Sequence, residues 1–468
     1  MSEKGKLADE AQETINQIRA ALTPVAGGPD ISSSRERSIP GVRNFDFGTL
    51  PEYELLKIQK VAGEIAGIEN PYYRLHDGRA AETTLLNGRQ VVNFSSYDYV
   101  GLNGHAEVSA AAKAAIDRFG TSVSASRLTA GERQVHRDLE IALARLHGVE
   151  DCLTFVSGHA TNVSVIGGLL GPNDLIVTDA LIHNSVVEGA KLSGAKRVMC
   201  PHGDIDAIER ALRLNRRRHG RALIVVEGLY SMDGDVPDLS ALVRLKRRYE
   251  SWLMVDEAHS VGVLGATGRG IAEEQGVDPT DIDIWMGTLS KALASSGGYV
   301  AGSHRLIELL KYTSPGFVYS VGASPGVAAA ALAAIMVLQR EPWRLRDLRQ
   351  NGRNFLSGAQ SRGLDTGRSI GAAVVPIIVG SSPAAVILSQ RLLLRGYNVV
   401  PIIFPGVAEN QSRLRFFITS RHAADQMAGV LDAVAEELSE IRKAPSFVNI
   451  IAERAAAGVP GPDSSVIS

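Results

Sequence analysis

Seven short apolar runs between residues 151 and 303 constrain the fold of this chain more than any other feature of the sequence. They read CLTFVSG, DLIVTDA, AKRVMC, ALIVVEG, SWLMVDEA, DIDIWMG and GGYVAGS, and stretches that suit crossover helices separate most of them. Apolar runs of about four to seven residues without strict alternation are typical of strands that are covered on both faces. The sequence therefore predicts an α/β domain built on a mainly parallel sheet.

Changes in composition around these runs predict five parts. They are an N-terminal extension (1–44), an N-terminal arm (45–104), a large domain (105–335), a smaller C-terminal α+β domain (336–445) and a tail (446–468). The arm holds a helical stretch and two strand-like runs, AETTLLNG and QVVNFSSYDY. The pair Asn87-Gly88 between these runs is typical of a two-residue hairpin turn.

The bulk composition favours a small-molecule partner. Lys and Arg (49) nearly balance Asp and Glu (51), so the charge gives no indication of nucleic acid or of an anionic membrane. The two cysteines, Cys152 and Cys200, exclude a disulfide framework and have no metal-ligand spacing, and no metal site is expected. We see neither a signal-peptide core nor an apolar segment of membrane-spanning length, and we expect a cytoplasmic protein.

Two charged residues follow neighbouring strands of the predicted sheet. Asp256 ends the run LMV, and Lys291 follows the run IWM. Ligands of open α/β sheets gather at the carboxyl ends of the strands, so we expect the two side chains to meet there. A lysine that forms an imine, with a carboxylate that keeps a pyridine nitrogen protonated, is what pyridoxal phosphate requires. The pattern predicts a site for this cofactor, with the Thr288 and Ser290 hydroxyls on its phosphate, although either charged residue alone would more often be structural.

A second loop offers further cofactor contacts. It contains Ser157, Gly158, His159 and Asn162, between the run CLTFV and a helix-like stretch. Backbone N–H groups at a helix start bind phosphate, and a glycine permits close approach. His183 follows the run DLIVTD at the same sheet edge, where its ring can stack on the pyridine. Alone, each of these residues would more often have a structural role.

Eight motifs, in this order, resemble those of the α-oxoamine synthases, which are fold-type I transferases dependent on pyridoxal phosphate. They are NFSSYDYVGL, SASRLTAGE, TFVSGHATN, DALIHNS, VEGLYSMDGD, VDEAHSVGVLG, GTLSKA and RLRFFITS. The family includes 8-amino-7-oxononanoate synthase, glycine C-acetyltransferase, 5-aminolevulinate synthase and serine palmitoyltransferase. The resemblance implies the aspartate aminotransferase-like fold and a homodimer.

The resemblance also implies roles for individual residues. Lys291 matches the lysine that holds the cofactor and later removes the Cα proton, and Asp256 matches the partner of the pyridine nitrogen. His183 matches the stacking histidine, and His259 the group near the phenolic oxygen. Arg415, in RLR, matches the arginine that binds the substrate carboxylate. Further matches are Ser231 near the cofactor, Gly158, the His159 backbone, Thr288 and Ser290 at the phosphate, and Ser320 in the segment that reaches the partner subunit.

Together these matches imply a decarboxylative condensation of an amino acid with an acyl thioester, carried by coenzyme A or by an acyl carrier protein, to give an α-aminoketone. Tyr97, a candidate substrate contact, stands in a tract that reads SYNYLG in serine palmitoyltransferases and SNDYLG in oxononanoate synthases. The stretch VVPIIFPGV lacks an arginine-proline-proline found there in some oxononanoate synthases and bacterial palmitoyltransferases. We therefore expect a serine palmitoyltransferase-like or polyketide-linked enzyme. The alternatives are 8-amino-7-oxononanoate synthase and glycine C-acetyltransferase.

Two other readings stay open at this point. One is a different fold-type I reaction, such as aminotransfer or aldol cleavage. The other is a non-catalytic partner subunit, against which Lys291 argues. A further hypothesis concerns residues 1–44, which would dock an acyl carrier protein or would be a disordered or dimer-bracing extension.

Overall fold

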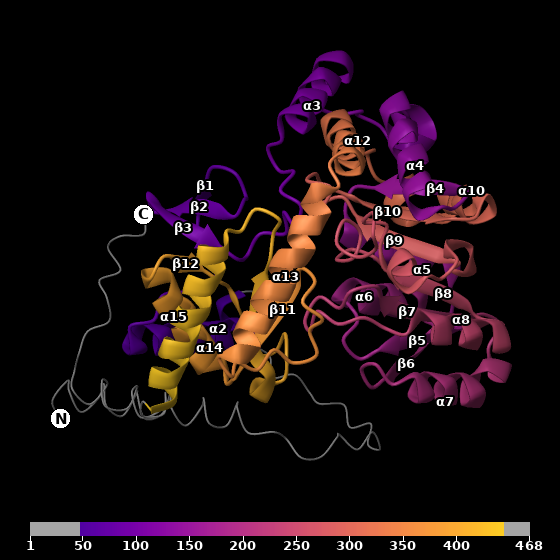
Figure 1. Cartoon of the computed structure of the whole chain (residues 1–468). Helices are drawn as coiled ribbons and strands as arrows, with labels where there is room; N and C mark the ends of the chain where they lie inside the picture. The colour runs from indigo at the N-terminus through magenta and orange to yellow at the C-terminus, as the bar shows by residue number, and fades with distance from the viewer. Residues whose placement is uncertain (1–46, 444–468) are drawn as a thin grey trace.

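The structure, a computed structural model, describes residues 47–443 (Figure 1). The predictions made for residues 1–44 and 446–468 lie outside this range. Within it, the strands form three sheets.

All seven apolar runs form strands of one large sheet. In chain order they are β4 (Asp151–Phe155), β5 (Leu175–Asp179), β6 (Lys196–Cys200), β7 (Ala222–Glu227), β8 (Trp252–Asp256), β9 (Ile284–Thr288) and β10 (Gly298–Gly302). Their order across the sheet is β4-β10-β9-β8-β7-β5-β6. Strand β10 is antiparallel to both of its neighbours, and the other pairs are parallel. The predicted mainly parallel sheet is confirmed.

Helices cover both faces of this sheet. Strand β7 places Leu223 and Val225 in one apolar cluster and Ile224 and Val226 in the other, and all four are buried. Continuous apolar runs therefore mark these strands because neither face meets water. The covering helices are α3 (Ala106–Phe119), α4 (Gln134–His147), α5 (Gly158–Leu169), α6 (Asn184–Ser193), α7 (Ile205–Asn215), α8 (Leu239–Arg248), α9 (Ile271–Gln275), α10 (His304–Thr313), α11 (Pro315–Val318) and α12 (Pro325–Arg340).

A second, antiparallel sheet follows the large sheet in the chain. It has the order β11 (Val374–Gly380), β14 (Ser412–Phe417), β13 (Pro401–Ile402). The helices of this second unit are α13 (Trp343–Ser361), α14 (Ser382–Leu394) and α15 (Ala424–Lys443).

The N-terminal arm joins this second unit. After helix α2 (Pro51–Ala66), strands β1 (His76–Asp77), β2 (Thr83–Leu86) and β3 (Arg89–Asn93) form a sheet with β12 (Tyr397–Asn398). Figure 1 shows the indigo arm beside the yellow and orange C-terminal elements. Phe94 packs against Phe355 and Phe416 in one buried cluster. The sequence analysis gives the arm as a separate part. It cannot detect the pairing of β3 with β12, because the two strands are far apart in the chain.

The hairpin is confirmed, but its second strand is shorter than expected. Asn87 and Gly88 form its turn with φ of 50° and 74°, a left-handed conformation that these two residue types tolerate. Strand β3 ends at Asn93, whereas the apolar run continues to Tyr99. The reason is local: the Asn93 and Asp98 side chains accept backbone N–H groups, which replaces the ladder with turns.

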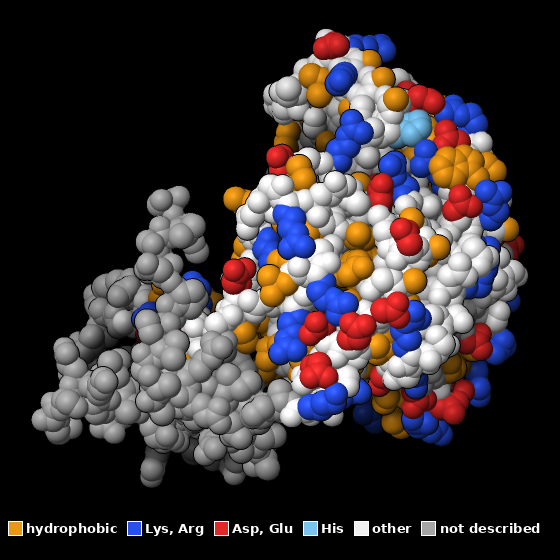
Figure 2. All heavy atoms as spheres, turned by 60° about the vertical axis from the view of Figure 1, so that its left-hand side comes forward, with side chains coloured by type: hydrophobic (Ala, Val, Ile, Leu, Met, Phe, Trp, Pro, Cys, Tyr) orange, Lys and Arg blue, Asp and Glu red, His pale blue; other side chains and the backbone are white. Residues whose placement is uncertain are grey.

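Charged side chains of both signs lie on the surface of the described residues (Figure 2). Within residues 47–443, no helix combines the length and the apolar character needed to cross a membrane. On the face shown in Figure 2, basic and acidic side chains are interspersed, without an extended patch of one sign.

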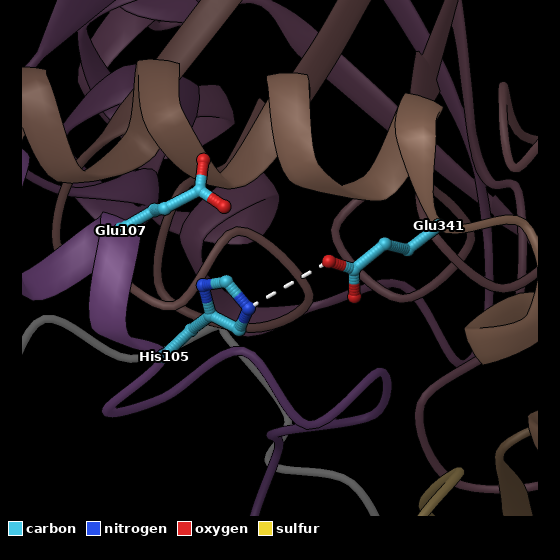
Figure 3. Close-up of side chains that lie close together, drawn as sticks. All are labelled: His105, Glu107 and Glu341. Carbon is cyan, nitrogen blue, oxygen red and sulfur yellow. Dashed lines mark ion pairs between the residues drawn. The ribbon is translucent and has the colours of Figure 1, made fainter.

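A polar junction joins helices α3 and α12. His105, Glu107 and Glu341 lie close together there (Figure 3). The Arg340 guanidinium already pairs with Glu107, and the Arg344 guanidinium donates to Glu341 at 2.8 Å. Because arginines balance both carboxylates, we assign no metal ion to this cluster.

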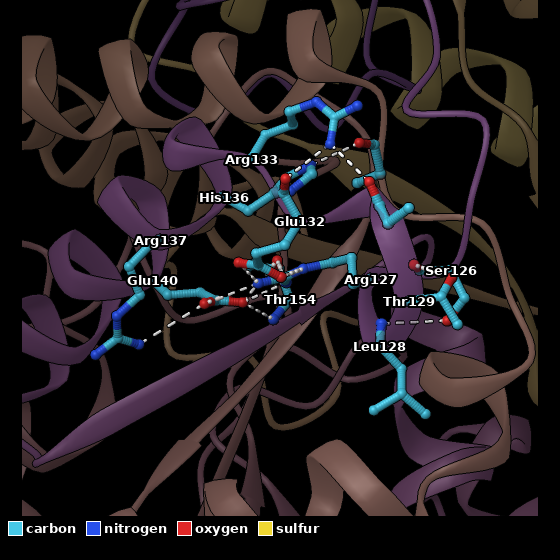
Figure 4. Close-up of polar contacts among 12 residues, drawn as sticks. Ser126, Arg127, Leu128, Thr129, Glu132, Arg133, His136, Arg137, Glu140 and Thr154 are labelled. Atoms are coloured by element: carbon cyan, nitrogen blue, oxygen red, sulfur yellow. Dashed lines mark hydrogen bonds and ion pairs between the residues drawn. The ribbon is translucent and has the colours of Figure 1, made fainter.

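A buried ion network links helix α4 to strand β4. Arg127 begins the π-helix η2 (Arg127–Gly131), and its side chain is 3% exposed. Its guanidinium donates to Glu140 at 2.5 Å, to Glu132 at 2.7 Å and to the Thr154 hydroxyl at 3.0 Å (Figure 4). Glu140 is fully buried, so this arginine supplies the charge that compensates it.

We expect Arg127→Ala to lower the free energy of unfolding by about 3–5 kcal/mol, because the buried Glu140 carboxylate then loses its direct hydrogen-bonded cation and keeps the more distant Arg137, at 3.7 Å. Urea denaturation measures this loss. The control is Arg210→Ala, which removes an exposed partner of Asp204 at 3.4 Å. That variant should lose less than about 1 kcal/mol. Equal losses in the two variants would contradict the compensating role of Arg127.

Candidate active site

A cavity of about 260 Å³ lies at the carboxyl ends of β7, β8 and β9. From the sequence-predicted set it is lined by Ser157, Gly158, His159, Asn162, His183, Asp256, His259, Thr288, Ser290 and Lys291. Ser185, Glu227, Ala258 and Met286 complete the lining. The sheet edge thus gathers the predicted charged residues, as the rule for open α/β sheets requires.

Asp256 ends β8 and is buried. Its Oδ2 accepts a hydrogen bond from Asn162 Nδ2 at 2.9 Å, and its Oδ1 accepts one from the Ala258 N–H at 3.0 Å. The same Asn162 amide donates to Ser185 Oγ at 2.9 Å, and this hydroxyl lies 2.7 Å from His183 Nδ1. A continuous chain of hydrogen bonds therefore links the carboxylate to the histidine ring.

Lys291 follows β9 and is largely enclosed. Burial lowers the pKa of its amine, while the charges of Asp256 and Glu227 oppose this shift. Its Nζ lies 5.6 Å from the centroid of the Tyr97 ring. A lowered pKa increases the fraction of neutral amine, which is the nucleophilic form.

His259 is held as a neutral ring. Burial lowers its pKa well below the ordinary value, and Lys291 and Arg415 add to the effect. Its Nδ1 lies 2.7 Å from the hydroxyl of Tyr99, which is fully buried. When the Tyr99 hydroxyl donates to Nδ1, the hydroxyl hydrogen has an acceptor. The neutral ring then carries its proton on Nε2. The opposite arrangement would leave a buried O–H without an acceptor among the described residues, at a cost of about 1–3 kcal/mol.

The start of helix α5 provides an anion site. Its N-cap residue is Ser157, whose Oγ accepts the Ala160 N–H at 3.0 Å. The first N–H groups of a helix lack intrahelical acceptors and favour a phosphate. A Cβ on Gly158 would lie 3.3 Å from Thr288 Oγ1, so the glycine keeps this approach open. Thr288 Oγ1 also lies 2.8 Å from Ser290 Oγ, so the two hydroxyls are neighbours in the cavity lining.

Three predicted residues lie beside the cavity rather than in its lining: Arg415, Ser231 and Tyr97. A fourth, Ser320, lies apart from it. Arg415 extends from β14, and its Nη1 donates to the Ser231 carbonyl at 2.9 Å. Tyr97 reaches the site through its contact with Lys291. Ser320 does not line the cavity, and its hydroxyl donates to the carbonyl of the next residue. Its expected role toward a partner subunit stays a prediction.

Sequence reasoning missed three residues of the site. Glu227 ends the run ALIVVE as Asp256 ends LMVD, so the same sheet-edge rule could have identified it. Ser185 lies two positions after His183, within a motif already selected. Tyr99 carried no signal of its own, because its contact with His259 joins residues 160 positions apart.

A charged histidine holds the loop that carries Ser231. His202 Nδ1 lies 2.9 Å from Asp179, and its Nε2 lies 2.9 Å from Asp235. Carboxylates accept only, so both ring nitrogens must donate and the ring is an imidazolium. Burial alone would lower the pKa of His202, but the two carboxylates outweigh it and raise this pKa to about 10. This cation, and the pairing of Arg413 with Asp233, balance the local acids without a metal ion.

Comparisons with known proteins agree with this geometry. Residues 89–434 match the family described as aminotransferase class I and II. The chain belongs to this family. The 8-amino-7-oxononanoate synthase of Geobacter sulfurreducens is 40% identical over 383 residues, which cover 81% of this chain and 97% of that protein. The corresponding enzyme of Cellvibrio japonicus is 38% identical over 355 residues, with 76% and 88% covered.

Solved structures lead to the same group. The serine palmitoyltransferase of Sphingomonas wittichii superposes with a TM-score of 0.80 at 29% identity, and covers 86% of this chain and 100% of that one. A structure of the S. paucimobilis serine palmitoyltransferase, with a TM-score of 0.81 and 26% identity, covers 85% and 100% and contains bound PLP. The fold is therefore the fold-type I transferase fold, and this family member is an α-oxoamine synthase, as the motifs indicate.

The cavity fits pyridoxal phosphate. It combines a largely enclosed amine (Lys291), a buried carboxylate (Asp256) and the open N-terminus of α5. A Cβ on Gly298 would approach the Gly158 Cα to 2.6 Å, so a glycine at position 298 lets β10 pack directly against the start of α5. The amine can bind the cofactor's aldehyde, the carboxylate can pair with its pyridine nitrogen, and the helix N-terminus can bind its phosphate.

We expect His202→Gln to destabilise the protein in a pH-dependent way. The folded-state pKa of about 10 exceeds the unfolded value of 6.5, so the stabilisation is complete below about pH 6.5 and is lost as pH rises through about 10. The difference in melting temperature between wild type and variant should therefore shrink from about pH 6 to pH 10. In the control His219→Gln, the ring contacts only the Asn215 carbonyl, and the difference should stay constant.

Proposed function

We propose that this enzyme joins an amino acid to an acyl thioester with loss of carbon dioxide, in the cavity at the carboxyl ends of β7, β8 and β9. The observation that supports this most is that Lys291 and Asp256 line one cavity, on neighbouring strand ends, beside the open start of α5. The product would be an α-aminoketone.

The cofactor is pyridoxal phosphate, which supplies an electron sink for a carbanion at the substrate Cα. We assign to the Lys291 amine the covalent attachment and then the acceptance of the Cα proton at Nζ. Asp256 would face the pyridine nitrogen, with its orientation set by Asn162 and the Ala258 N–H. His183 would stack on the ring, and the His259 Nε2–H would donate to the phenolic oxygen.

The substrate carboxylate would bind at Arg415. Its guanidinium is half-buried above the Phe417 ring, at 4.7 Å from the ring centroid. Within residues 47–443, its Nη1 donates to the Ser231 carbonyl and to the Met232 sulfur. Its buried Nε has no hydrogen-bond partner among residues 47–443. A guanidinium with spare donors suits a bidentate carboxylate contact.

Two substrate pairs are favoured by different observations. The relatives that are about 40% identical are named 8-amino-7-oxononanoate synthase, which favours L-alanine and an acyl chain that ends in a carboxylate. The tract around Tyr97 and the solved structures favour L-serine and palmitoyl thioester. Mass spectrometry of products from L-alanine, L-serine and glycine with both acyl types would decide between them. Aminotransfer or aldol cleavage would release no thiol in the same assay.

The assembly we propose is a homodimer in the cytoplasm. Tyr319 is 87% exposed and Tyr73 is 96% exposed. Both lie in segments that a second copy could bury in an isologous interface. The acyl donor would be coenzyme A or a carrier protein, and the carrier-docking hypothesis concerns residues 1–44, outside the described range.

Lys291→Ala should abolish the visible absorbance of the covalently held cofactor and the condensation activity, because no other residue is assigned to hold the aldehyde. Borohydride reduction followed by peptide mass spectrometry should no longer label the peptide around position 291. The control Lys191→Ala removes an exposed amine that pairs with Glu188, and it should keep both signals. A retained band in Lys291→Ala would refute the assignment.

Arg415→Ala should raise the KM for the amino acid about 30-fold, which corresponds to the loss of about 2 kcal/mol from a charge-assisted contact. Steady-state kinetics at saturating acyl thioester measures it. Arg391→Ala, which removes an arginine paired with Glu437 on the outer helices, should leave KM unchanged. An unchanged KM in Arg415→Ala would place the carboxylate elsewhere.

A further inference from the structure

Glu227 is a buried carboxyl in the cavity to which the mechanism above gives no role. It ends β7, directly beside Asp256 in the sheet register, and it is 3% exposed. Its Oε2 accepts the Ser231 N–H at 3.0 Å. Its Oε1 has no hydrogen-bond partner among residues 47–443, although the side chain lines the cavity.

The two neighbouring carboxyls differ in their hydrogen bonds. Both oxygens of Asp256 accept N–H groups, whereas only one oxygen of Glu227 does. Two adjacent buried carboxylates repel each other, so one of the pair keeps a proton. The proton belongs on the oxygen that lacks a donor, which is Glu227 Oε1.

Glu227 also stands next to the residue assigned to the substrate carboxylate. Glu227 receives the N–H of Ser231, and Arg415 donates to the carbonyl of the same serine. Glu227 and Arg415 therefore both contact the backbone of one residue. A carboxylate that binds at Arg415 would be repelled by an ionised Glu227, but a protonated one can donate to it.

We propose that Glu227 is a further catalytic residue, which stays protonated at neutral pH and donates a hydrogen bond from Oε1 to the carboxylate of the amino-acid substrate. The proposal deepens the function proposed above and rests on it for the identity of the substrate. No proton is transferred in this contact. Its consequence is that ionisation of Glu227 weakens amino-acid binding.

The surrounding charges support this state. Burial, followed by the charge of Asp256, raises the pKa of Glu227 to about 8. Three groups oppose the shift: the backbone N–H of Ser231, the charge of Lys291 beyond β9, and the backbone N–H of His183. His183 faces the same cavity from the start of α6, and Tyr230 lies next to Ser231 in the loop after β7.

The first measurement is independent of catalysis. Infrared spectra of the holoenzyme in D2O should contain a protonated-carboxyl band at neutral pH that titrates near pH 8 and is missing in Glu227→Gln. Thermal unfolding gives a second readout. Because the folded-state pKa is raised, wild type loses stability as pH rises through about 8, and the glutamine variant should not show this loss.

The second measurement concerns binding. With L-serine as the probe, followed by the change in cofactor absorbance, the wild-type affinity should fall about tenfold between about pH 7 and pH 9, as the protonated fraction falls. In Glu227→Gln the amide keeps a donor toward the cavity and an acceptor for Ser231, so the affinity should change less than about twofold over the same range.

Glu257 provides a matched control. It is also fully buried, and burial raises its pKa to about 7, but its oxygens accept from Ser260 and from the Ile271 N–H, and it does not line the cavity. Glu257→Gln should remove its own infrared band and leave the pH dependence of L-serine binding as in wild type.

The outcomes separate this inference from the proposed function. An unchanged infrared band in Glu227→Gln, or the absence of a protonated band that titrates near pH 8 in wild type, overturns the protonation of Glu227. A wild-type pH dependence in the glutamine variant overturns its contact with the carboxylate. If L-serine does not bind at any pH, the substrate is different, and the infrared and thermal results still decide the state of Glu227.

Discussion

The buried carboxylate of Asp256 is the constraint on which the rest of the site depends. An isolated ionised carboxylate is costly in an apolar interior unless hydrogen bonds and a nearby cation compensate it. Here Asn162 from α5 and the Ala258 N–H supply the hydrogen bonds. The chain through Ser185 then fixes the His183 ring. The position of one carboxylate thus orients groups from α5, β8 and α6 together.

The second structural unit completes this site across the sheet edge. Arg415 and Arg413 are neighbours on the same strand, β14, and both reach the loop after β7, where they contact Ser231 and Asp233. The His202 imidazolium holds that loop from the other side through Asp235. The loop is therefore fixed by cations from both units. Movement between the units would change the distance between Arg415 and the cavity, which couples substrate binding to their packing.

The sequence predicts the large sheet well because strands covered on both faces are continuous apolar runs, and residues at their carboxyl ends must share one edge. This rule places Asp256, Thr288 and Lys291 correctly beside one cavity. It does not predict the contact of Tyr99 with His259, or that β3 pairs with β12, because these depend on packing between distant segments. The end of β3 at Asn93 was missed since side-chain hydrogen bonds, rather than hydrophobicity, stop the strand.

Burial acts on each titratable group of the cavity in the direction that its chemistry needs. It lowers the pKa values of Lys291 and His259, which favours a nucleophilic amine and a neutral ring, and it raises that of Glu227. Each oxygen of Asp256 accepts one N–H group, from Asn162 and from Ala258. At the opposite end, the lining beside α5 offers hydroxyls and helix N–H groups rather than a lysine or arginine within the described residues. A phosphate there would be stabilised by dipoles.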